Sequence, residues 1–180
     1  MQVRETGFRN LFVIEPDIFE DKRGYFFESW NRERFKEAGL DADFLQDNQS
    51  MSAVNVIRGM HFQLPPWQQG KLVRVFSGSV LDVVVDLRKA EPTFGRHYKI
   101  LLTAKQKNML WIPPGFAHGF LTLEENTVFF YKCTQVYHRD AEAAIAWNDS
   151  DLAIDWGVKD PVVSEKDKNA PAFKDFVSPF

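Results

Sequence analysis

Residues 71–87 read KLVRVFSGSVLDVVVDL, and this stretch decides how the rest of the chain is interpreted. Two short runs rich in Val and Leu, 71–76 and 79–87, flank the dipeptide Ser77-Gly78. Runs of this length and composition are typical of β-strands, and a Ser-Gly pair between them predicts a tight turn. The stretch therefore predicts two strands joined by a tight turn.

Similar runs recur on both sides, separated by turn residues. They are LFVIE at 11–15, NQSMSAVNVI at 48–57, HYKILLT at 97–103, NMLWI at 108–112, HGFLTL at 118–123 and TVFFYKCTQV at 127–136. Short strands at such spacing indicate a β-sandwich or barrel, and the 17 Phe, 5 Trp and 4 Tyr suit its core. The one convincing helix spans 31–38, with Asn31 as its N-cap and Gly39 after its end. We predict an all-β fold with one or two short helices.

Composition limits the class of protein. The chain has 180 residues, 44% of them hydrophobic, and a formal net charge of −3. We expect a single domain, with N-terminal strands and a short helix in 1–45, a barrel in 46–150 and an irregular tail in 151–180. No apolar run reaches the roughly 20 residues of a membrane span, and the N-terminus lacks an apolar signal segment. With an acidic balance and Cys133 as its single cysteine, we expect a cytoplasmic protein that binds neither nucleic acid nor membrane.

Basic side chains gather around His61. Arg58 precedes it by three residues and Lys71 opens the next strand, so a hairpin-like connection would bring three basic groups to one mouth. Cations gathered locally in a chain of net negative charge indicate an anionic ligand, although solvated strand ends remain the alternative for Arg58 and Lys71. His61 itself lies between Met60 and Phe62, and either satisfies its nitrogens internally or titrates for a purpose.

A second histidine follows a stiff bend. In WIPPGFAHGF at 111–120, Pro-Pro-Gly bends the chain just before His118. The two segments together resemble the two motifs of cupins, which are small jelly-roll barrels. Metal-binding cupins carry His-x-His and a Glu in the first motif, where this chain has His61, Gln63 and then no glutamate before Lys71. Because an ammonium group repels a divalent ion, we expect no metal at this site.

One family shares motifs with nearly the whole chain. The shared segments are DKRGYFFE at 21–28, QDN at 46–48, RGMHFQ at 58–63, QGKLVR at 69–74, PTFG at 92–95, LWIPPGFAHGF at 110–120, YK at 131–132 and SEKD at 164–167. In this order they resemble the dTDP-4-dehydrorhamnose 3,5-epimerases. The resemblance implies a homodimeric cupin jelly roll that needs no cofactor and converts dTDP-4-dehydro-6-deoxy-D-glucose to dTDP-4-dehydro-L-rhamnose. It also implies a role in dTDP-L-rhamnose biosynthesis for lipopolysaccharide O-antigen and other surface polysaccharides.

The resemblance assigns catalytic roles to four residues. Moving protons at C3 and C5, both α to a ketone, needs a base, an acid on the opposite face and support for an enolate oxygen. His61 is implied to be the base, because imidazole titrates near neutral pH, and Asp167 is implied to bind its other ring nitrogen. Lys71 is implied to stabilise the enolate oxygen, and Tyr131 to be the acid.

The remaining matches are implied to hold the nucleotide and the sugar. Planar guanidinium groups suit a diphosphate, which points to Arg23 and Arg58. The other implied substrate contacts are Glu28, Gln46, Asp47 and Asn48 around thymine, Phe19 or Phe26 stacked on it, and Lys71, His118, Glu142 and Lys166 elsewhere. Asp82 lies in an apolar strand, where a carboxylate is costly without a partner, and His118 is the partner we expect.

Three alternatives remain open. A mono-epimerase that acts at C3 or C5 alone would share most of these residues. A metal-dependent cupin enzyme would need a third and a fourth ligand. A non-catalytic module that binds nucleotide sugars would keep the arginines, but it has no need of Lys71, Tyr131 and Asp167 together.

Overall fold

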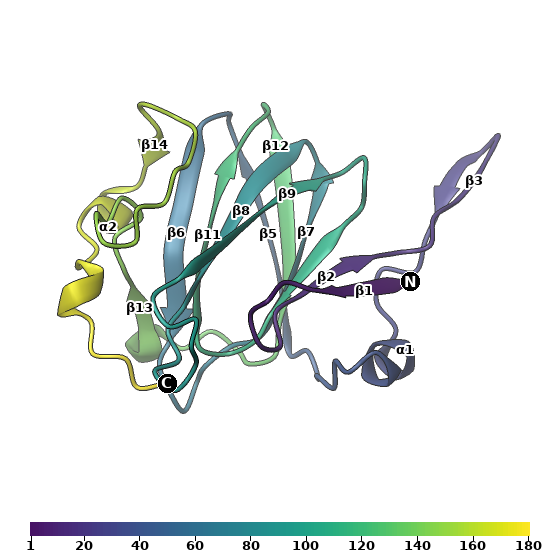
Figure 1. The fold of residues 1–180 in the computed structure, drawn as a ribbon. Helices are drawn as coiled ribbons and strands as arrows, with labels where there is room; N and C mark the ends of the chain where they lie inside the picture. Colours follow the sequence, from purple (N-terminus) through teal and green to yellow (C-terminus); the bar gives the residue numbers. More distant parts are fainter.

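The computed structural model describes residues 1–180 as two β-sheets packed face to face (Figure 1). The first sheet has the strand order β1-β2-β10-β7-β12-β5, and the second has the order β13-β6-β11-β8-β9, with the short β14 parallel to β6. The strands are β1 Gln2–Glu5, β2 Phe12–Glu15, β5 Gln46–Ser52, β6 Val56–Gln63, β7 Lys71–Ser77, β8 Ser79–Asp86, β9 His97–Thr103, β10 Met109–Ile112, β11 Phe116–Thr122, β12 Thr127–Cys133, β13 Glu142–Ala144 and β14 Val162–Val163. From β9 to β12, each strand lies in the opposite sheet from the one before it. This wrapping is a jelly roll, and the predicted all-β fold is confirmed.

Two connections differ from the sequence prediction. The run predicted at 48–57 divides into β5 and β6, because the chain turns at Asn55, whose φ is +62°. These two strands lie in different sheets, as do β6 and β7. The hairpin-like connection predicted between Arg58 and Lys71 is therefore wrong. Residues 64–70 instead cross from one sheet to the other, so Arg58 and Lys71 lie on strands of different sheets.

Both helices are short. In α1 (Arg32–Glu37), the Asn31 side chain accepts a hydrogen bond from the Arg34 N–H, and Phe35 is buried against the outer face of the first sheet. In α2 (Glu165–Lys168), the Ser164 hydroxyl accepts from the Asp167 N–H. The prediction of one or two short helices is confirmed. Neither helix has the length and apolar character needed to cross a membrane.

A small hairpin stands apart from the sandwich. Strands β3 (Phe19–Asp21) and β4 (Gly24–Phe26) pair only with each other, and Figure 1 shows them projecting beyond the end of β2. Their aromatic side chains are open to solvent, with Phe19 65% and Phe26 70% exposed. Three-residue strands without a buried face carry no alternating pattern, which is why the sequence does not predict them.

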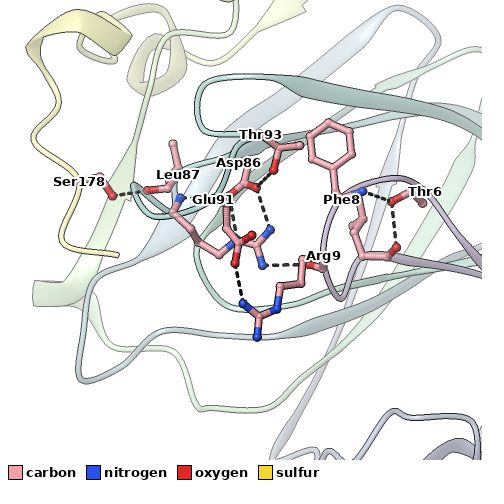
Figure 2. Close-up of polar contacts among 10 residues, drawn as sticks. Thr6, Phe8, Arg9, Asp86, Leu87, Glu91, Thr93 and Ser178 are labelled. Carbon is pink, nitrogen blue, oxygen red and sulfur yellow. Dashed lines mark hydrogen bonds and ion pairs between the residues drawn. The ribbon is translucent and has the colours of Figure 1, made fainter.

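The C-terminal tail is fixed to the second sheet by aromatic packing and by a hydrogen bond. Phe62 of β6 packs edge-on against Phe176 and against Phe180, with ring centroids 5.1 and 6.2 Å apart. The Ser178 hydroxyl also donates to the carbonyl of Leu87, just after the end of β8 (Figure 2). The tail therefore covers the outer face of β6, and α2 is held beside that strand.

A buried carboxylate organises the end of β8 (Figure 2). Asp86 is fully buried and accepts two hydrogen bonds from the Arg88 guanidinium, at 2.8 and 2.7 Å, one from the Arg88 N–H at 3.0 Å and one from the Thr93 hydroxyl at 2.6 Å. The remaining Arg88 nitrogen donates to the carbonyl of Arg9 at 2.9 Å. Charge-assisted bonds of this kind satisfy a buried charge, and here they also join the N-terminal segment to the β8–β9 connection.

Candidate active site

A bulge in β6 puts two of the predicted residues on one face. His61 pairs with His118 of β11 and Arg58 pairs with Phe120, so three steps along β6 match two along β11. Arg58 and His61 consequently line the same cavity although they are three residues apart. Between them, Gly59 has a φ of +143°, and a Cβ there would lie 2.5 Å from the Gly119 Cα. Only glycine allows the two strands to approach so closely.

Two adjoining cavities meet at His61, which lines both. The first, of about 320 Å³, lies between the sheets and contains Lys71, Tyr131 and Glu142. The second, of about 500 Å³, lies between β6 and the tail and contains Arg58, Lys166 and Asp167. Nine of the predicted site residues, Gln46 and Asn48 among them, thus line two cavities that share His61.

His61 and Asp167 form the closest polar contact in this region. The His61 Nε2 lies 2.6 Å from the Asp167 Oδ1, while the Asp167 Oδ2 accepts the Gly59 N–H at 3.3 Å. Burial alone would raise the pKa of Asp167, but the hydrogen bonds and charge of His61 and the hydrogen bonds of Gly59 and Ser164 hold that pKa below its usual value. The carboxylate stays ionised and orients the ring, which leaves Nδ1 free to take a proton.

Lys71 and Tyr131 face His61 from the opposite sheet. They lie on β7 and β12, and the Lys71 Nζ is 5.9 Å from the centre of the Tyr131 ring. Burial raises the pKa of Tyr131 and lowers that of Lys71, and the Glu142 carboxylate partly opposes the lowering at Lys71. A base thus lies on one wall of the cavity, and a cation and a phenol lie on the other.

Asp82 and His118 lie deeper, inside the barrel. The His118 Nε2 is 2.9 Å from the Asp82 Oδ2, so the predicted contact between them is confirmed. Burial raises the pKa of Asp82 and lowers that of His118, and it therefore favours the uncharged form of each. Neither residue lines the two cavities. No group of three or more His, Cys, Asp or Glu side chains is arranged to hold a metal ion.

Glu142 and Lys166 join the two cavities at the surface. The Lys166 Nζ lies 2.6 Å from the Glu142 Oε2, which also accepts the Tyr137 hydroxyl at 3.1 Å. Burial raises the pKa of Glu142, but these two hydrogen bonds outweigh it, so the pKa falls below its usual value. The ion pair links α2 to β13 across the mouth of the site.

The first cavity also contains residues to which the sequence assigned no role. Gln63 and Tyr137 line it together with the expected Gln46 and Asn48. Gln63 belongs to the RGMHFQ segment at 58–63, so the sequence could have marked it as a site residue. Tyr137 lies in a connecting loop, where no sequence pattern marks it.

Besides Asp82 and His118, five further predicted residues line neither cavity. Asp47 is on the outer face of the first sheet, where the Lys132 Nζ binds it at 2.8 Å. Glu28 accepts hydrogen bonds from Asn31 and Arg34 at the start of α1. The other three, Arg23, Phe19 and Phe26, lie on the β3–β4 hairpin. Their predicted contacts with substrate are not formed around the cavity of their own chain.

The sequence and the fold were both compared with those of known proteins. The family model described as dTDP-4-dehydrorhamnose 3,5-epimerase matches residues 5–175. A dTDP-4-dehydrorhamnose 3,5-epimerase of Shigella flexneri is 46% identical over 176 residues, 97% of each chain. The crystal structure of the corresponding epimerase of Elizabethkingia anophelis shares 47% identity and a TM-score of 0.93 over 97% of each chain. A Legionella pneumophila dTDP-6-deoxy-D-glucose-3,5-epimerase, solved in complex with dTDP-4-keto-L-rhamnose, shares 42% identity and a TM-score of 0.93 over 98% of this chain and 94% of that one. The chain therefore belongs to the dTDP-4-dehydrorhamnose 3,5-epimerase family.

Proposed function

We propose that this chain is a dTDP-4-dehydrorhamnose 3,5-epimerase. Its substrate is dTDP-4-dehydro-6-deoxy-D-glucose, its product is dTDP-4-dehydro-L-rhamnose, and its place is in dTDP-L-rhamnose biosynthesis. The observation that carries the proposal is the His61–Asp167 pair on one wall of a cavity, opposite Lys71 and Tyr131 on the other. Membership of the family supplies the identity of the nucleotide sugar.

The reaction begins at His61. Its Nδ1 takes the proton from a carbon α to the C4 ketone, and the C–H electron pair becomes part of the enolate. Asp167 stabilises the resulting imidazolium through its hydrogen bond to Nε2, without itself accepting the proton. An oriented base of this kind contributes about 10²- to 10⁴-fold to the rate.

The opposite wall completes the inversion. Negative charge grows on the C4 oxygen, and the Lys71 ammonium lies on the side of the cavity where it can stabilise that charge. Tyr131 then gives its phenolic proton to the same carbon from the face opposite His61, so the configuration inverts. Solvent returns a proton to Tyr131 and removes one from His61, after which the second carbon reacts in the same way.

The second cavity supplies cations for the diphosphate. Arg58 and Lys166 line it, and Arg58 is oriented by a 3.1 Å hydrogen bond from its Nε to the Ser52 hydroxyl. Guanidinium and ammonium groups are the usual protein partners of phosphate oxygens. The sugar is then placed at His61, where the two cavities meet.

The proposal includes a homodimer. The hairpin that carries Arg23 projects away from the two packed sheets (Figure 1), and none of its residues lines the two cavities. On the outer face of the first sheet, Phe76 and Met51 are 41% and 64% exposed. A second copy that covers this face and receives the hairpin would bring Arg23 and the aromatic side chains of β3 and β4 to a substrate. We expect sedimentation analysis to give twice the chain mass, and a monomer at working concentration would contradict the dimer.

One experiment tests the reaction. The protein, purified without added metal, is incubated with dTDP-4-keto-6-deoxyglucose in D₂O, and deuterium in the sugar is measured by mass spectrometry. Incorporation at both C3 and C5 supports the proposal. Incorporation at one carbon indicates a mono-epimerase, and none, with folded protein, indicates a binding module or a metal-dependent enzyme, which elemental analysis would separate. His61→Ala should abolish exchange and retain nucleotide binding, while His97→Ala on β9 serves as the control.

A further inference from the structure

Gln63 is a buried amide whose polar atoms are all bound to backbone. It ends β6 two residues after His61, and only 4% of it is exposed. Its Nε2 donates to the carbonyl of Trp67 at 2.6 Å and to that of Val136 at 3.3 Å, and its Oε1 accepts the His138 N–H at 2.7 Å. One side chain thus joins the loop of residues 64–70 to the loop of residues 134–138, and we call these three bonds the Gln63 clamp.

The two loops behave as one packed unit. The rings of Trp67 and His138 stack with centroids 4.4 Å apart and an angle of 13° between their planes. The Gln69 side chain adds a 2.7 Å hydrogen bond to the carbonyl of Gln135. Of these contacts, the Gln63 clamp alone reaches the residues on both sides of Tyr137, which is why its loss should affect that residue most.

Tyr137 carries the effect of the clamp to the substrate region. Its N–H donates to the Gln46 Oε1 at 2.7 Å, and its hydroxyl donates to the Glu142 Oε2 at 3.1 Å. Glu142 in turn binds Lys166 on α2 at 2.6 Å. A continuous series of polar contacts therefore runs from Gln63, through the wall of the first cavity, to the helix that carries Asp167.

We propose that Gln63 is a positioning residue that fixes Tyr137 and Glu142 at the cavity wall and thereby sets the affinity for the nucleotide sugar. The inference rests on the proposed function and extends it to a residue that touches no reacting atom. Both of its amide N–H groups donate to the two loops. The amide therefore orders the wall of the first cavity instead of binding a ligand directly. Side chains held in place before binding cost less ordering on association, which improves affinity without changing the chemical step.

The test removes the clamp in two chemically different ways. Gln63→Met keeps the length of the side chain and loses all three hydrogen bonds, while Gln63→Glu keeps the acceptor for the His138 N–H and sets an oxygen against two carbonyls. We expect each variant to raise KM about tenfold, because the loosened wall must be ordered again when the substrate binds. We expect kcat to stay within about threefold of the parent, because the lost contacts would stabilise the bound substrate and the transition state equally. A rise in KM for Gln63→Glu alone would show a charge effect and overturn the proposal.

Asn108 offers a matched control. Only 8% of it is exposed, and its amide also joins backbone groups, accepting from the Thr103 N–H at 3.1 Å and donating to the carbonyl of Leu101 at 2.8 Å. It lines neither cavity. Asn108→Leu should lower the melting temperature, as Gln63→Met does, and leave KM unchanged. If both variants lose stability and neither changes KM, Gln63 is structural only and the proposal fails. A fall in kcat with unchanged KM also overturns it, because Gln63 would then act on the chemistry.

A second readout separates this inference from the proposed function. Hydrogen exchange at the Tyr137 and His138 amides should become faster in Gln63→Met and stay unchanged in Asn108→Leu. If the wild-type chain exchanges no deuterium into the sugar, the proposed function fails. In that case dTDP binding measured by calorimetry replaces KM, and binding by Gln63→Met as tight as wild type would overturn the positioning role.

Discussion

The His61 imidazole and the Asp167 carboxylate are 106 residues apart in the sequence and 2.6 Å apart in the structure. They meet because the C-terminal tail packs on the outer face of the second sheet, where α2 presents Asp167 beside the bulge of β6. The same carboxylate accepts the Gly59 N–H, so one group orients both the base and the backbone that carries it. Catalytic geometry in this chain thus depends on the docking of the tail.

We expect Asp167→Asn to lower kcat about 10²- to 10⁴-fold, because an amide neither stabilises the imidazolium nor fixes the ring in the required tautomer. Single-turnover deuterium exchange from D₂O into the sugar measures the loss. Glu165→Gln, on the same helix and ion-paired only with Lys168, is the control and should keep full activity. Equal activity of Asp167→Asn and the parent would remove Asp167 from the mechanism.

The sequence predicts the long strands that hold the site better than it predicts the exposed segments around them. The run at 97–103 coincides with β9 because it is an unbroken run rich in Tyr, Ile, Leu and Thr, whereas β3 and β4 are missed because three exposed residues carry no pattern. The position of Asp47 follows from the alternation of side chains along its strand. Alternation along β5 places Gln46 and Asn48 on one face and Asp47 on the other, and the Lys132 ion pair keeps it there.

Long-range contacts are the part that sequence patterns could not provide. Asp167 lies in a run of charged residues that reads as solvated surface, and only the family resemblance selects it. Its burial, with 3% exposed, arises from packing of the tail against β6, which no local pattern encodes. The bulge in β6 is equally hidden, since it depends on how β11 pairs with that strand.

Tyr131→Phe should separate exchange from inversion. His61 can still remove an α-proton and return solvent deuterium from its own face, but no acid remains on the opposite wall. We therefore expect deuterium to enter the unchanged substrate while formation of the L-rhamno product falls at least about 10²-fold. Product configuration by NMR, together with deuterium content by mass spectrometry, distinguishes the two events. Normal inversion by this variant would assign the acid elsewhere.

Gly119→Ala should disturb the paired strands that hold the base. A Cβ at Gly119 would lie 2.7 Å from the Met60 Sδ and 2.9 Å from the Arg58 carbonyl oxygen. Crowding of this kind costs about 1–3 kcal/mol, and relief of it must move the strand segment that carries His61. We expect lower stability in urea and slower exchange. Gly157→Ala has no atom within 4 Å of its new Cβ and a φ of +70°, so it should lose stability through backbone strain alone and keep its activity.

Stability should depend on Asp149 in a defined pH range. Burial opposes its ionisation, but the N–H groups of Phe173, Leu152 and Asp151 outweigh burial and hold the pKa of Asp149 below its ordinary value of 3.8. A carboxylate with a lowered pKa stabilises the fold fully above its unfolded pKa, and that contribution disappears as the pH falls through its folded pKa. We expect Asp149→Asn to lower the free energy of unfolding at neutral pH, and the difference from wild type to shrink as the solution is acidified. The bond to the Phe173 N–H, at 2.8 Å, anchors the segment just after α2. Epimerase activity should therefore fall together with stability in this variant, and a difference that stays constant across the acid range would show that ionised Asp149 does not hold the tail.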